Sequence, residues 1–329
     1  MVRAAVRCRV DLAGGTLDIW PLGQMHPGSS TVNVAIDLSA RVVARRRESG
    51  FEVRQAGSSR SGARPEELLS DPETALAALV ALELGLPAVA LELTSESPRG
   101  GGLGASSALT VAMLAAGELL ACGRLLWSPE RRAAVARDLE ARLMGLPTGM
   151  QDHLPGQLGG ALSIAHRAGG ESVRRLDVDL AALGEHWLVG FTGQSHFSAA
   201  NNWSILRRRF ERDTDVVSRL DAIRDVAAAL PEALEHGDWR ESGRLVGREW
   251  EARRGLAPEV TTPRVEGLLA LARELGAWGG KACGAGGGGS LVVLSPAARR
   301  EAVAAAWARE GVEILAARPT AEGLETELG

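Results

Sequence analysis

The feature that most constrains the fold of this chain is a run of small residues between a strand-like segment and an almost wholly apolar helix. Residues 88–94 alternate apolar side chains as a β-strand does, and residues 108–121 predict a helix buried on most sides. The connecting segment from Ser97 to Ser107 reads SPRGGGLGASS. Glycine lets a backbone approach a phosphate closely, and a helix N-terminus presents free N–H groups. The pattern therefore predicts a phosphate-binding loop.

Two well-known phosphate loops do not match this segment. It has no Gly-Lys-Ser/Thr sequence, which excludes a Walker loop, and Gly102-x-Gly104-x-x-Ser107 fits the dinucleotide fingerprint only in part. A tight turn capped by serine is the simpler interpretation, but the density of small residues before a buried helix favours phosphate binding. The hydroxyls of Ser106 and Ser107 are placed to cap the helix, to bind phosphate or to ligate Mg²⁺.

A second glycine cluster runs from Gly279 to Gly289 and contains the pattern G-x-G-x-x-G. The segment after it, residues 291–294, has the character of a strand and not of a helix, which argues against a Rossmann site. Flexible linkers rarely occur inside a short connection between a helix and a strand. We therefore expect the backbone of this cluster to contact phosphate or substrate.

Composition limits the classes of function. A length of 329 residues suggests two domains, and a change in composition places the boundary near residue 185, giving segments 1–185 and 186–329. The net charge of −4 argues against a nucleic-acid partner. The longest apolar stretch, residues 75–93, is interrupted by Glu83, Gly85 and Pro87, which argues against a membrane span. Three cysteines and no signal-like N-terminus predict a reduced, cytoplasmic protein.

Helices and strands are expected to alternate along the chain. Strands are expected near residues 6–12, 30–43, 161–164, 188–192, 290–294 and 312–315, and helices near 72–84, 129–144, 199–250, 265–275 and 296–310. Residues 57–64 are rich in Ser, Gly and Arg and predict a loop tip. The alternation favours an α/β (α+β) fold.

Three motifs, in this order, resemble those of the GHMP kinase superfamily, named for galacto-, homoserine, mevalonate and phosphomevalonate kinases. They are residues 9–18 (RVDLAGGTLD), residues 98–108 (PRGGGLGASSA) and residues 281–289 (KACGAGGGG). The resemblance covers nearly the whole chain. It implies a phosphate-loop N-terminal domain, a ferredoxin-like C-terminal domain, and ATP and Mg²⁺ as cofactors.

Within the superfamily, the chain is most similar to D-glycero-D-manno-heptose 7-phosphate kinase and related sugar kinases. Residues 149–152 (GMQD) and the cluster at 279–289 carry this likeness. The chain departs from it at residues 14–18, which read GGTLD where the heptose kinases usually have GGGTD. It departs again at His153-Leu154, where they usually have Gln-Tyr. These differences concern the identity of the sugar more than the type of reaction.

The resemblance also implies roles for individual residues. Asp152 resembles the catalytic aspartate that receives the proton of the substrate hydroxyl, and Arg9 resembles its basic partner. Ser107 and Glu140 resemble Mg²⁺ ligands. A helix N-cap is the alternative role for Asp152, and a solvated helix residue is the alternative for Glu140.

The same resemblance distributes the two ligands over the motifs. The phosphates of ATP are expected to contact Pro98, Gly100, Gly101, Gly102, Leu103, Gly104, Ala105, Ser106 and Ser107. The sugar is expected to contact Gly15, Thr16, Asp18, Gly286 and Gly287. Residues 192–196 (TGQSH), which follow a predicted strand, are a further candidate for the sugar site.

The expected partners are ATP and a small sugar or sugar phosphate, with no nucleic acid and no membrane, in a monomer or a homodimer. A phosphorylated sugar would need a basic pocket, and Arg7, Arg41, Arg99 and Arg174 are unranked candidates for it. A GHMP kinase of another branch, acting on a mevalonate-like or amino-acid alcohol, is one alternative. A non-catalytic nucleotide- or sugar-binding regulator is another, although such a protein would be expected to lack some of the catalytic and metal-binding residues.

Overall fold

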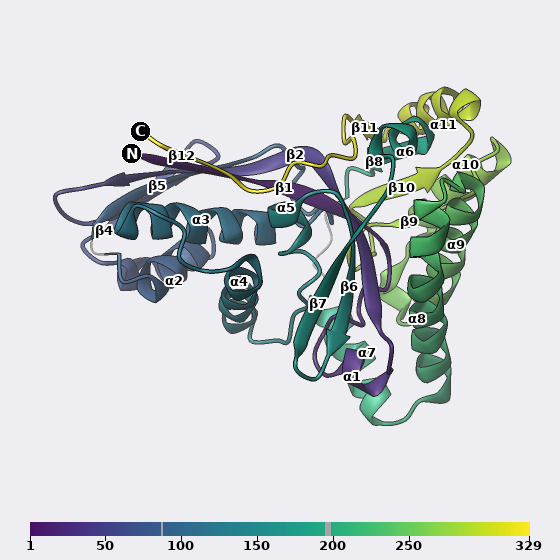
Figure 1. Cartoon of the computed structure of the whole chain (residues 1–329), viewed down its shortest axis with the longest axis horizontal. Helices are drawn as coiled ribbons and strands as arrows, with labels where there is room; N and C mark the ends of the chain where they lie inside the picture. Colours follow the sequence, from purple (N-terminus) through teal and green to yellow (C-terminus); the bar gives the residue numbers. More distant parts are fainter. Residues whose placement is uncertain (87, 195–198) are drawn as a thin grey trace.

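The computed structural model describes residues 1–86, 88–194 and 199–329. The chain forms two β-sheets with helices packed against them, and strands and helices occur in both halves of an elongated molecule (Figure 1). The first sheet lies over helices α2, α3 and α4, and the second lies among the helices of the C-terminal half. This arrangement confirms the α/β (α+β) class that the alternating segments predict.

The first sheet is mostly antiparallel. Its strands lie in the order β12 (Glu325–Leu328), β1 (Val2–Ala13), β2 (Ser30–Arg46), β5 (Val89–Ser95), β3 (Phe51–Gln55) and β4 (Ser58–Gly62). The long strand β2 also pairs with β6 (Ala161–Arg167), which pairs in turn with β7 (Gly170–Leu176). Strands β1 and β2 carry the first motif toward the centre of the molecule.

Helix α3 (Ala105–Cys122) forms the core beneath this sheet, and α2 (Ala75–Glu83) and α4 (Pro129–Met144) pack against its other side (Figure 1). Its length and apolarity would suffice to cross a membrane, but 72% of it is buried inside the protein. The helix begins three residues earlier than residue 108, because Gly104 adopts a left-handed conformation (φ 70°) and serves as the N-cap. Ser106 and Ser107 therefore lie in the first turn of the helix.

The start of α4 follows the sequence prediction. The hydroxyl of Ser128 accepts a hydrogen bond from the backbone N–H of Arg131 at 3.2 Å, and Pro129 occupies the first helical position. Gly145 ends the helix with a left-handed φ of 66°. Between α4 and β6, the chain forms the short helix α5 (Pro155–Leu158).

The second sheet is fully antiparallel, and its strands lie in the order β11 (Glu313–Leu315), β8 (Trp187–Phe191), β10 (Ser290–Leu294) and β9 (Gly279–Ala282). In chain order this is the 4-1-3-2 arrangement of a ferredoxin-like sheet. The helices of this half are α6 (Leu180–His186), α7 (Ala199–Phe210), α8 (Thr214–Glu235), α9 (Trp239–Arg253), α10 (Pro263–Glu274) and α11 (Ala297–Arg309). The expected ferredoxin-like C-terminal part is therefore present.

Helix α9 lies unusually close to strand β9. A Cβ atom on Gly279 would lie 2.0 Å from the carbonyl oxygen of Gly243, so a side chain cannot fit between the two elements. Further along the two elements, Glu249 of α9 lies beside Lys281 of β9, with Nζ of the lysine 3.2 Å from the carboxylate.

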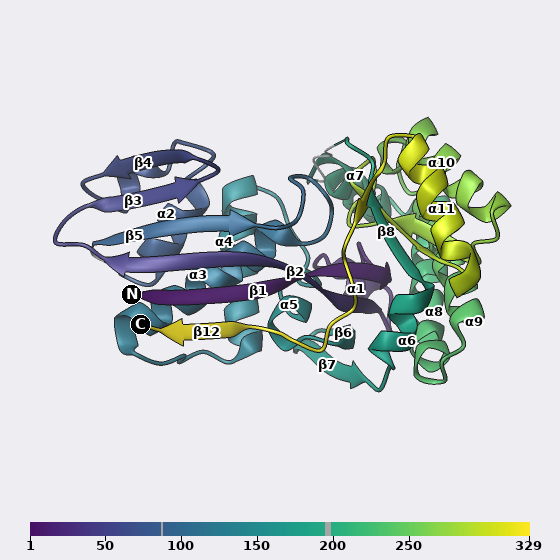
Figure 2. The same ribbon diagram turned by 90° about the horizontal axis from the view of Figure 1, so that it is seen from above.

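The chain returns to the first sheet at its C-terminal end. The indole N–H of Trp187 donates to the carbonyl of Ala317 at 2.9 Å, and β12 then pairs with β1 so that Val2 faces Leu328. The two ends of the described chain consequently lie side by side (Figure 2). The last strand thus belongs to the first sheet.

The prediction of a loop at residues 57–64 is wrong. Residues 58–62 form strand β4, which pairs with β3 across a two-residue turn. The turn residues Ala56 and Gly57 both have positive φ angles, 50° and 80°. Two successive positive φ angles give the backbone twist that favours a tight hairpin. Asn, Asp or Gly usually occupies the first turn position, so an alanine there gives no turn signal in the sequence.

Candidate active site

The glycine-rich segment between β5 and α3 folds into a loop that is held by strands from both sheets. The N–H of Arg9 donates to the carbonyl of Leu103 at 3.0 Å, and the N–H of Ser290 donates to that of Gly101 at 2.8 Å. Gly102 has a φ of 72°, and a Cβ there would lie 2.6 Å from the carbonyl oxygen of Cys283. Glycine is required at this position both for its conformation and for the close packing of the two glycine clusters.

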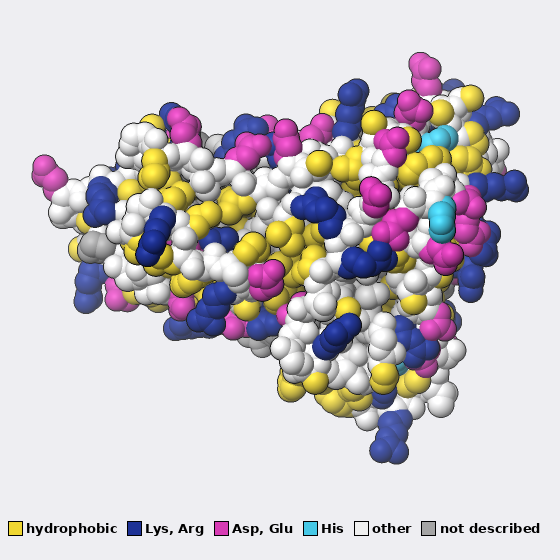
Figure 3. Space-filling model, viewed as in Figure 1, with side chains coloured by type: hydrophobic (Ala, Val, Ile, Leu, Met, Phe, Trp, Pro, Cys, Tyr) yellow, Lys and Arg dark blue, Asp and Glu magenta, His cyan; other side chains and the backbone are white. Residues whose placement is uncertain are grey.

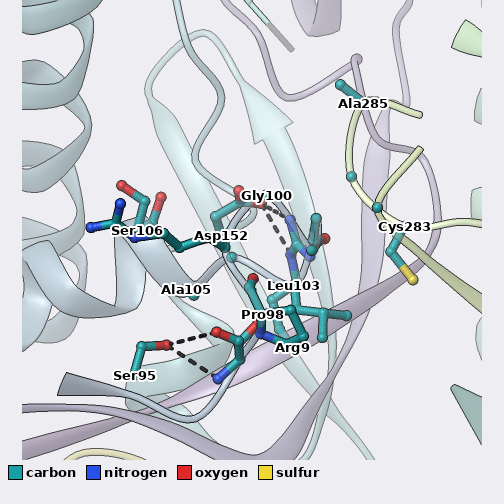
Figure 4. A pocket seen from close by; sticks show the side chains of 18 of the residues that line it. Arg9, Ser95, Pro98, Gly100, Leu103, Ala105, Ser106, Asp152, Cys283 and Ala285 are labelled. Carbon is teal, nitrogen blue, oxygen red and sulfur yellow. Dashed lines mark hydrogen bonds and ion pairs between the residues drawn. The ribbon is translucent and has the colours of Figure 1, made fainter. Parts of the chain in front are cut away.

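A cavity of about 390 Å³ opens over this loop (Figure 4). The loop residues that line it are Pro98, Gly100, Gly101, Gly102, Leu103, Gly104, Ala105, Ser106 and Ser107, which are all the positions expected to contact phosphate. The N-cap of α3 is a glycine without a capping side chain, so no side chain competes for the first N–H groups of the helix. The helix dipole adds to the attraction of this end for an anion.

Arg9 and Asp152 form an ion pair at the edge of this cavity (Figure 4). The Nε and Nη2 atoms of Arg9 both donate to Oδ1 of Asp152, at 3.0 and 2.5 Å, and Nη1 donates to the carbonyl of Gly102 at 2.7 Å. Burial lowers the pKa of Arg9, but the carboxylates of Asp152 and Asp11 raise it by more, so the guanidinium stays charged. The side chain of Asp152 is 32% exposed and accessible to a ligand.

Glu140 projects from α4 toward the first turn of α3. The hydroxyls of Ser107 and Thr110 donate to its two carboxylate oxygens, each at 2.9 Å, and Nε2 of His153 lies 3.2 Å from Oε2. Burial raises the pKa of Glu140, but His153 and the hydroxyl donors lower it by more. The solvated-helix alternative for Glu140 is wrong, because only 8% of the residue is exposed.

This carboxylate and its hydroxyl neighbours suit one kind of metal. In the part of the chain that the structure describes, no three His, Cys, Asp or Glu side chains converge as a cage for a transition metal. One carboxylate and a hydroxyl beside a phosphate-sized cavity match Mg²⁺, which keeps water ligands and takes further oxygens from phosphates. Ser107 and Glu140 therefore fit the role expected of them.

A smaller cavity of about 80 Å³ adjoins the first one. Arg9, Asp152, Gly284 and Ala285 line both, so the ion pair lies where the two cavities meet. The residues that line only the smaller cavity are Thr16, Asp18, Ile19, Thr148, Gly149, Gln151, Asn202 and Arg253. Two ligands, one bound in each cavity, would therefore approach each other at Asp152.

Asp18 lines this smaller cavity. Its Oδ2 atom accepts a hydrogen bond from the backbone N–H of Gln151 at 3.2 Å. Burial and the charge of Asp152 raise the pKa of Asp18 to about 6, against the effect of backbone N–H donors and Arg253. A Cβ on Gly149 would lie 1.6 Å from the Asp18 carboxylate, so glycine at 149 makes room for it.

Three of the expected sugar contacts lie elsewhere. Gly15 lines neither cavity, and its carbonyl accepts a hydrogen bond from Nη2 of Arg253 at 2.8 Å. Gly286 lines the larger cavity. Gly287 lines neither, and its N–H donates to the carbonyl of Val260 at 2.6 Å. Gly284 and Ala285 face the smaller cavity in their place. Of residues 192–196, Ser195 and His196 lie outside the described residues.

A buried network of charges behind the smaller cavity was not expected from the sequence. Nζ of Lys281 donates to Asp11 at 2.6 Å and lies 3.2 Å from Glu249, and Glu249 accepts from Nε of Arg253 at 2.8 Å. Nη1 of Arg253 donates to the hydroxyl of Thr16 at 3.0 Å. One signal was available: Lys281 is the only lysine in the sequence.

This network connects three distant parts of the chain. Asp11 also accepts a hydrogen bond from the backbone N–H of Gly284 at 2.7 Å. The first motif, the end of α9 and the second glycine cluster are thus fastened to one another around the smaller cavity. Hydrogen bonds from this network hold Thr16 and Gly284 in position, and both residues line the smaller cavity.

Comparisons with known proteins agree with this geometry. Residues 73–160 match the family description "GHMP kinases N terminal domain", and residues 230–313 match "GHMP kinases C terminal". The mevalonate kinase of Pyrococcus abyssi is 30% identical over 243 residues, which cover 73% of this chain and 69% of that enzyme. The L-fucokinase/L-fucose-1-P guanylyltransferase of Bacteroides fragilis is 27% identical over 87% of this chain, which spans 34% of that protein.

A solved structure shows the same fold over the full length. The crystal structure of a D-glycero-D-manno-heptose 1-phosphate kinase from Bacteroides thetaiotaomicron aligns with a TM-score of 0.81 and 21% identity, covering 100% of this chain and 99% of that one. The two matched segments contain the glycine-rich loop before α3 and, in the C-terminal half, helices α9, α10 and α11 with strands β9 and β10. The chain therefore belongs to the GHMP kinase family.

Proposed function

We propose that this protein is an ATP-dependent kinase that phosphorylates a hydroxyl group of a sugar or sugar phosphate, with Mg²⁺ as its metal. The observation that carries the proposal is the position of Asp152. Its carboxylate is accessible, is paired with Arg9, and lies where a phosphate-loop cavity meets a small polar cavity. Phosphoryl transfer needs two ligands held in line with one another, and this arrangement of cavities supplies the two places.

In this mechanism, the larger cavity holds ATP with its phosphates against the N–H groups of the loop and of the first turn of α3. Ser107 and Glu140 would hold Mg²⁺, which when bound neutralises charge on the phosphates. Glu140 is well suited because it is buried and its carboxylate stays ionised through its interaction with His153.

The acceptor hydroxyl would lie in the smaller cavity against Asp152. As the hydroxyl oxygen bonds to the γ-phosphorus, the bond from that phosphorus to the bridging oxygen of ATP breaks and ADP leaves. The proton of the hydroxyl passes to the Asp152 carboxylate. In a loose transition state the proton leaves late, so the orientation of the carboxylate matters more than its strength as a base. Arg9 supplies that orientation through its two hydrogen bonds to Oδ1, and its charge faces the transferring phosphoryl group.

The motifs favour a sugar kinase similar to the heptose 7-phosphate kinases. The solved heptose 1-phosphate kinase supports the same class through its fold, and the matched mevalonate kinases keep a mevalonate-like or amino-acid alcohol as the alternative. A non-catalytic binding protein is disfavoured, because such a protein would not be expected to keep Arg9, Asp152 and Ser107 beside one cavity with Glu140 hydrogen-bonded to Ser107.

Release of ADP in the presence of a panel of sugars, sugar phosphates and mevalonate tests this proposal. Replacing Asp152 with Asn should lower kcat by about 100-fold or more while leaving ATP binding intact. Asp225→Asn is the matched control, since Asp225 is exposed on α8 and pairs only with Arg224. Equal turnover by the Asp152→Asn variant and the wild type would contradict the assignment of Asp152.

Two further expectations belong to this proposal. The three cysteines, Cys8, Cys122 and Cys283, are all free in the structure, which supports a reducing cytoplasmic location. We also propose a domain boundary near residue 185, since β8 of the second sheet begins at Trp187. Limited proteolysis would test that boundary.

A further inference from the structure

The charges around the smaller cavity leave no surplus of positive charge. Two cations line it: Arg9, which is paired with Asp152, and Arg253, which is paired with Glu249. The buried Lys281 behind them lies between Asp11 and Glu249. Carboxylates in this cluster therefore outnumber cations, because Asp18 adds a further acid that makes no ion pair with any described residue.

No other arginine or lysine lines this cavity. Every arginine and the only lysine lie among the described residues, since positions 87 and 195–198 hold neither type. Three arginines that were candidates for a basic sugar-phosphate pocket are paired at other places: Arg7 with Glu322 and Glu325, Arg41 with Glu96, and Arg174 with Glu235. Arg99, the fourth, lines the larger cavity only.

On the face drawn in Figure 3, basic side chains are scattered among acidic ones. In the smaller cavity, an anionic group on the acceptor, whether phosphate or carboxylate, would lie among carboxylates. Each arginine that lines the cavity is already paired with an acid. Placing like charges side by side in a partly desolvated site costs enough to exclude a ligand.

The same cavity offers neutral groups that suit hydroxyls. The side-chain oxygen of Gln151 is buried and accepts no hydrogen bond from any described residue, although the residue lines the cavity. A Cβ on Gly15 would lie 3.0 Å from the amide nitrogen of Gln151, so the absence of a side chain there lets the amide pack against the backbone. A buried acceptor without a donor is costly, and a ligand hydroxyl would supply the donor.

We infer that the smaller cavity binds a sugar bearing neither a phosphate nor a carboxylate, and that Gln151 and Asp18 each accept a hydrogen bond from its hydroxyl groups. This inference rests on the proposed function in taking the smaller cavity as the acceptor site. Of the two substrate classes that the proposed function leaves open, a sugar and a sugar phosphate, the inference selects the unphosphorylated sugar. It also makes Gln151 a residue that determines specificity, since a site built to accept a hydroxyl proton rejects a ligand without one.

Calorimetric titration of the protein tests the inference, with Mg²⁺ and a non-hydrolysable ATP analogue present to fill the γ-phosphate position. The probes are matched pairs: D-mannose with its 6-phosphate, D-galactose with its 1-phosphate, and D-glycero-D-manno-heptose with its 7-phosphate. R-mevalonate supplies a carboxylate. At least one neutral sugar should bind about 100-fold more tightly than its phosphorylated partner and than R-mevalonate.

Variants make the test specific to the proposed contacts. Gln151→Leu should weaken binding of that sugar by about 10-fold or more, because the acceptor oxygen is lost. Gln24→Leu is the matched control: its side-chain oxygen is likewise unpartnered, but the residue lines neither cavity. Gln151→Glu keeps an acceptor in a side chain of similar size and should increase discrimination against phosphorylated sugars.

Each outcome decides the matter. Tighter binding of a phosphorylated sugar or of mevalonate overturns the inference, as does the absence of binding by every probe or an unchanged affinity in Gln151→Leu. ADP release separates the two proposals. A neutral sugar that binds but is not phosphorylated contradicts only the proposed kinase activity, whereas efficient turnover of a phosphorylated sugar contradicts only this inference.

Discussion

The only lysine of the chain, Lys281, donates to the carboxylate of Asp11 at 2.6 Å, with both side chains fully buried. The two residues come from different sheets, β9 and β1. Glu249 lies on the other side of the ammonium group at 3.2 Å. The small ammonium group of Lys281, held by two acids, thus joins the two sheets beneath the smaller cavity. The planar guanidinium group of an arginine would need more space there.

Replacing Lys281 with Met should destabilise the protein by about 3–5 kcal/mol, because Asp11 would be left buried without its principal cation. Chemical denaturation of both proteins at pH 7 measures the difference in the free energy of unfolding. Arg3→Met is the control, since it breaks a pair with Glu327 in which both side chains are more than half exposed. The control should change stability by less than about 1 kcal/mol.

The ε-amino group of Lys281 should resist amine-reactive labels in the folded protein, because its side chain has no exposed area. Mass spectrometry after brief labelling should find this lysine unmodified in buffer and modified in guanidinium chloride. Rapid labelling under native conditions would mean that the ion pair opens frequently. No other lysine complicates the measurement.

Gly102→Ala should raise the KM for ATP and destabilise the protein, because the new Cβ would lie 2.6 Å from the carbonyl of Cys283. Gly123→Ala is the matched control. Its φ of 73° is almost the same as the 72° of Gly102, but nothing lies within 4 Å of the added Cβ. Both variants incur conformational strain of about 1–2 kcal/mol, so any excess loss in Gly102→Ala measures the contact between the glycine clusters.

Glu140→Gln should raise the Mg²⁺ concentration needed for half-maximal activity by about 10-fold or more, since a neutral amide is a poorer ligand for a hard cation than a carboxylate. Titration of activity with Mg²⁺ at saturating ATP measures this shift. Glu130→Gln, in the exposed first turn of the same helix, should leave the titration unchanged. An unchanged requirement in Glu140→Gln would remove Glu140 from the metal site.

Acceptor binding should weaken as the pH falls through about 6, because the raised pKa of Asp18 converts its carboxylate to the neutral acid there. Only the carboxylate can accept hydrogen bonds with both oxygens. The KM for the acceptor, measured between pH 5 and pH 8 at saturating ATP, should fall as pH rises, and Asp18→Asn should lose this dependence.

The same group has the opposite effect on stability. Folded Asp18 releases its proton near pH 6, while the unfolded chain releases it near the ordinary value of 3.8. The native state therefore binds more protons between these values, and the contribution of Asp18 to stability decreases as pH rises through that interval. Denaturation of the wild type and of Asp18→Asn at pH 4.5 and pH 7 should show the wild type losing stability relative to the variant at the higher pH.

Local features of the fold were predictable because their causes are local. The cap at Ser128, the glycine loop and the apolar helix after it depend on residues only a few positions apart. Strands β7 and β12 were not predicted, because their sequences, GESVRRL and ETEL, are largely exposed and polar. They become strands by pairing with β6 and β1, and no periodicity within them indicates it.

In the candidate site, too, some features follow from local sequence and others only from tertiary packing. The sequence alone determined a glycine-rich loop at the start of a buried helix, since glycine conformations and the N–H groups of a helix end are properties of a short segment. Only the tertiary structure decided which glycines face which cavity, and it alone brought Asp18, Gln151, Arg253 and Lys281 around one space. Charges act through distance in space, and residues such as Asp11 and Lys281 become neighbours only when the two sheets pack together.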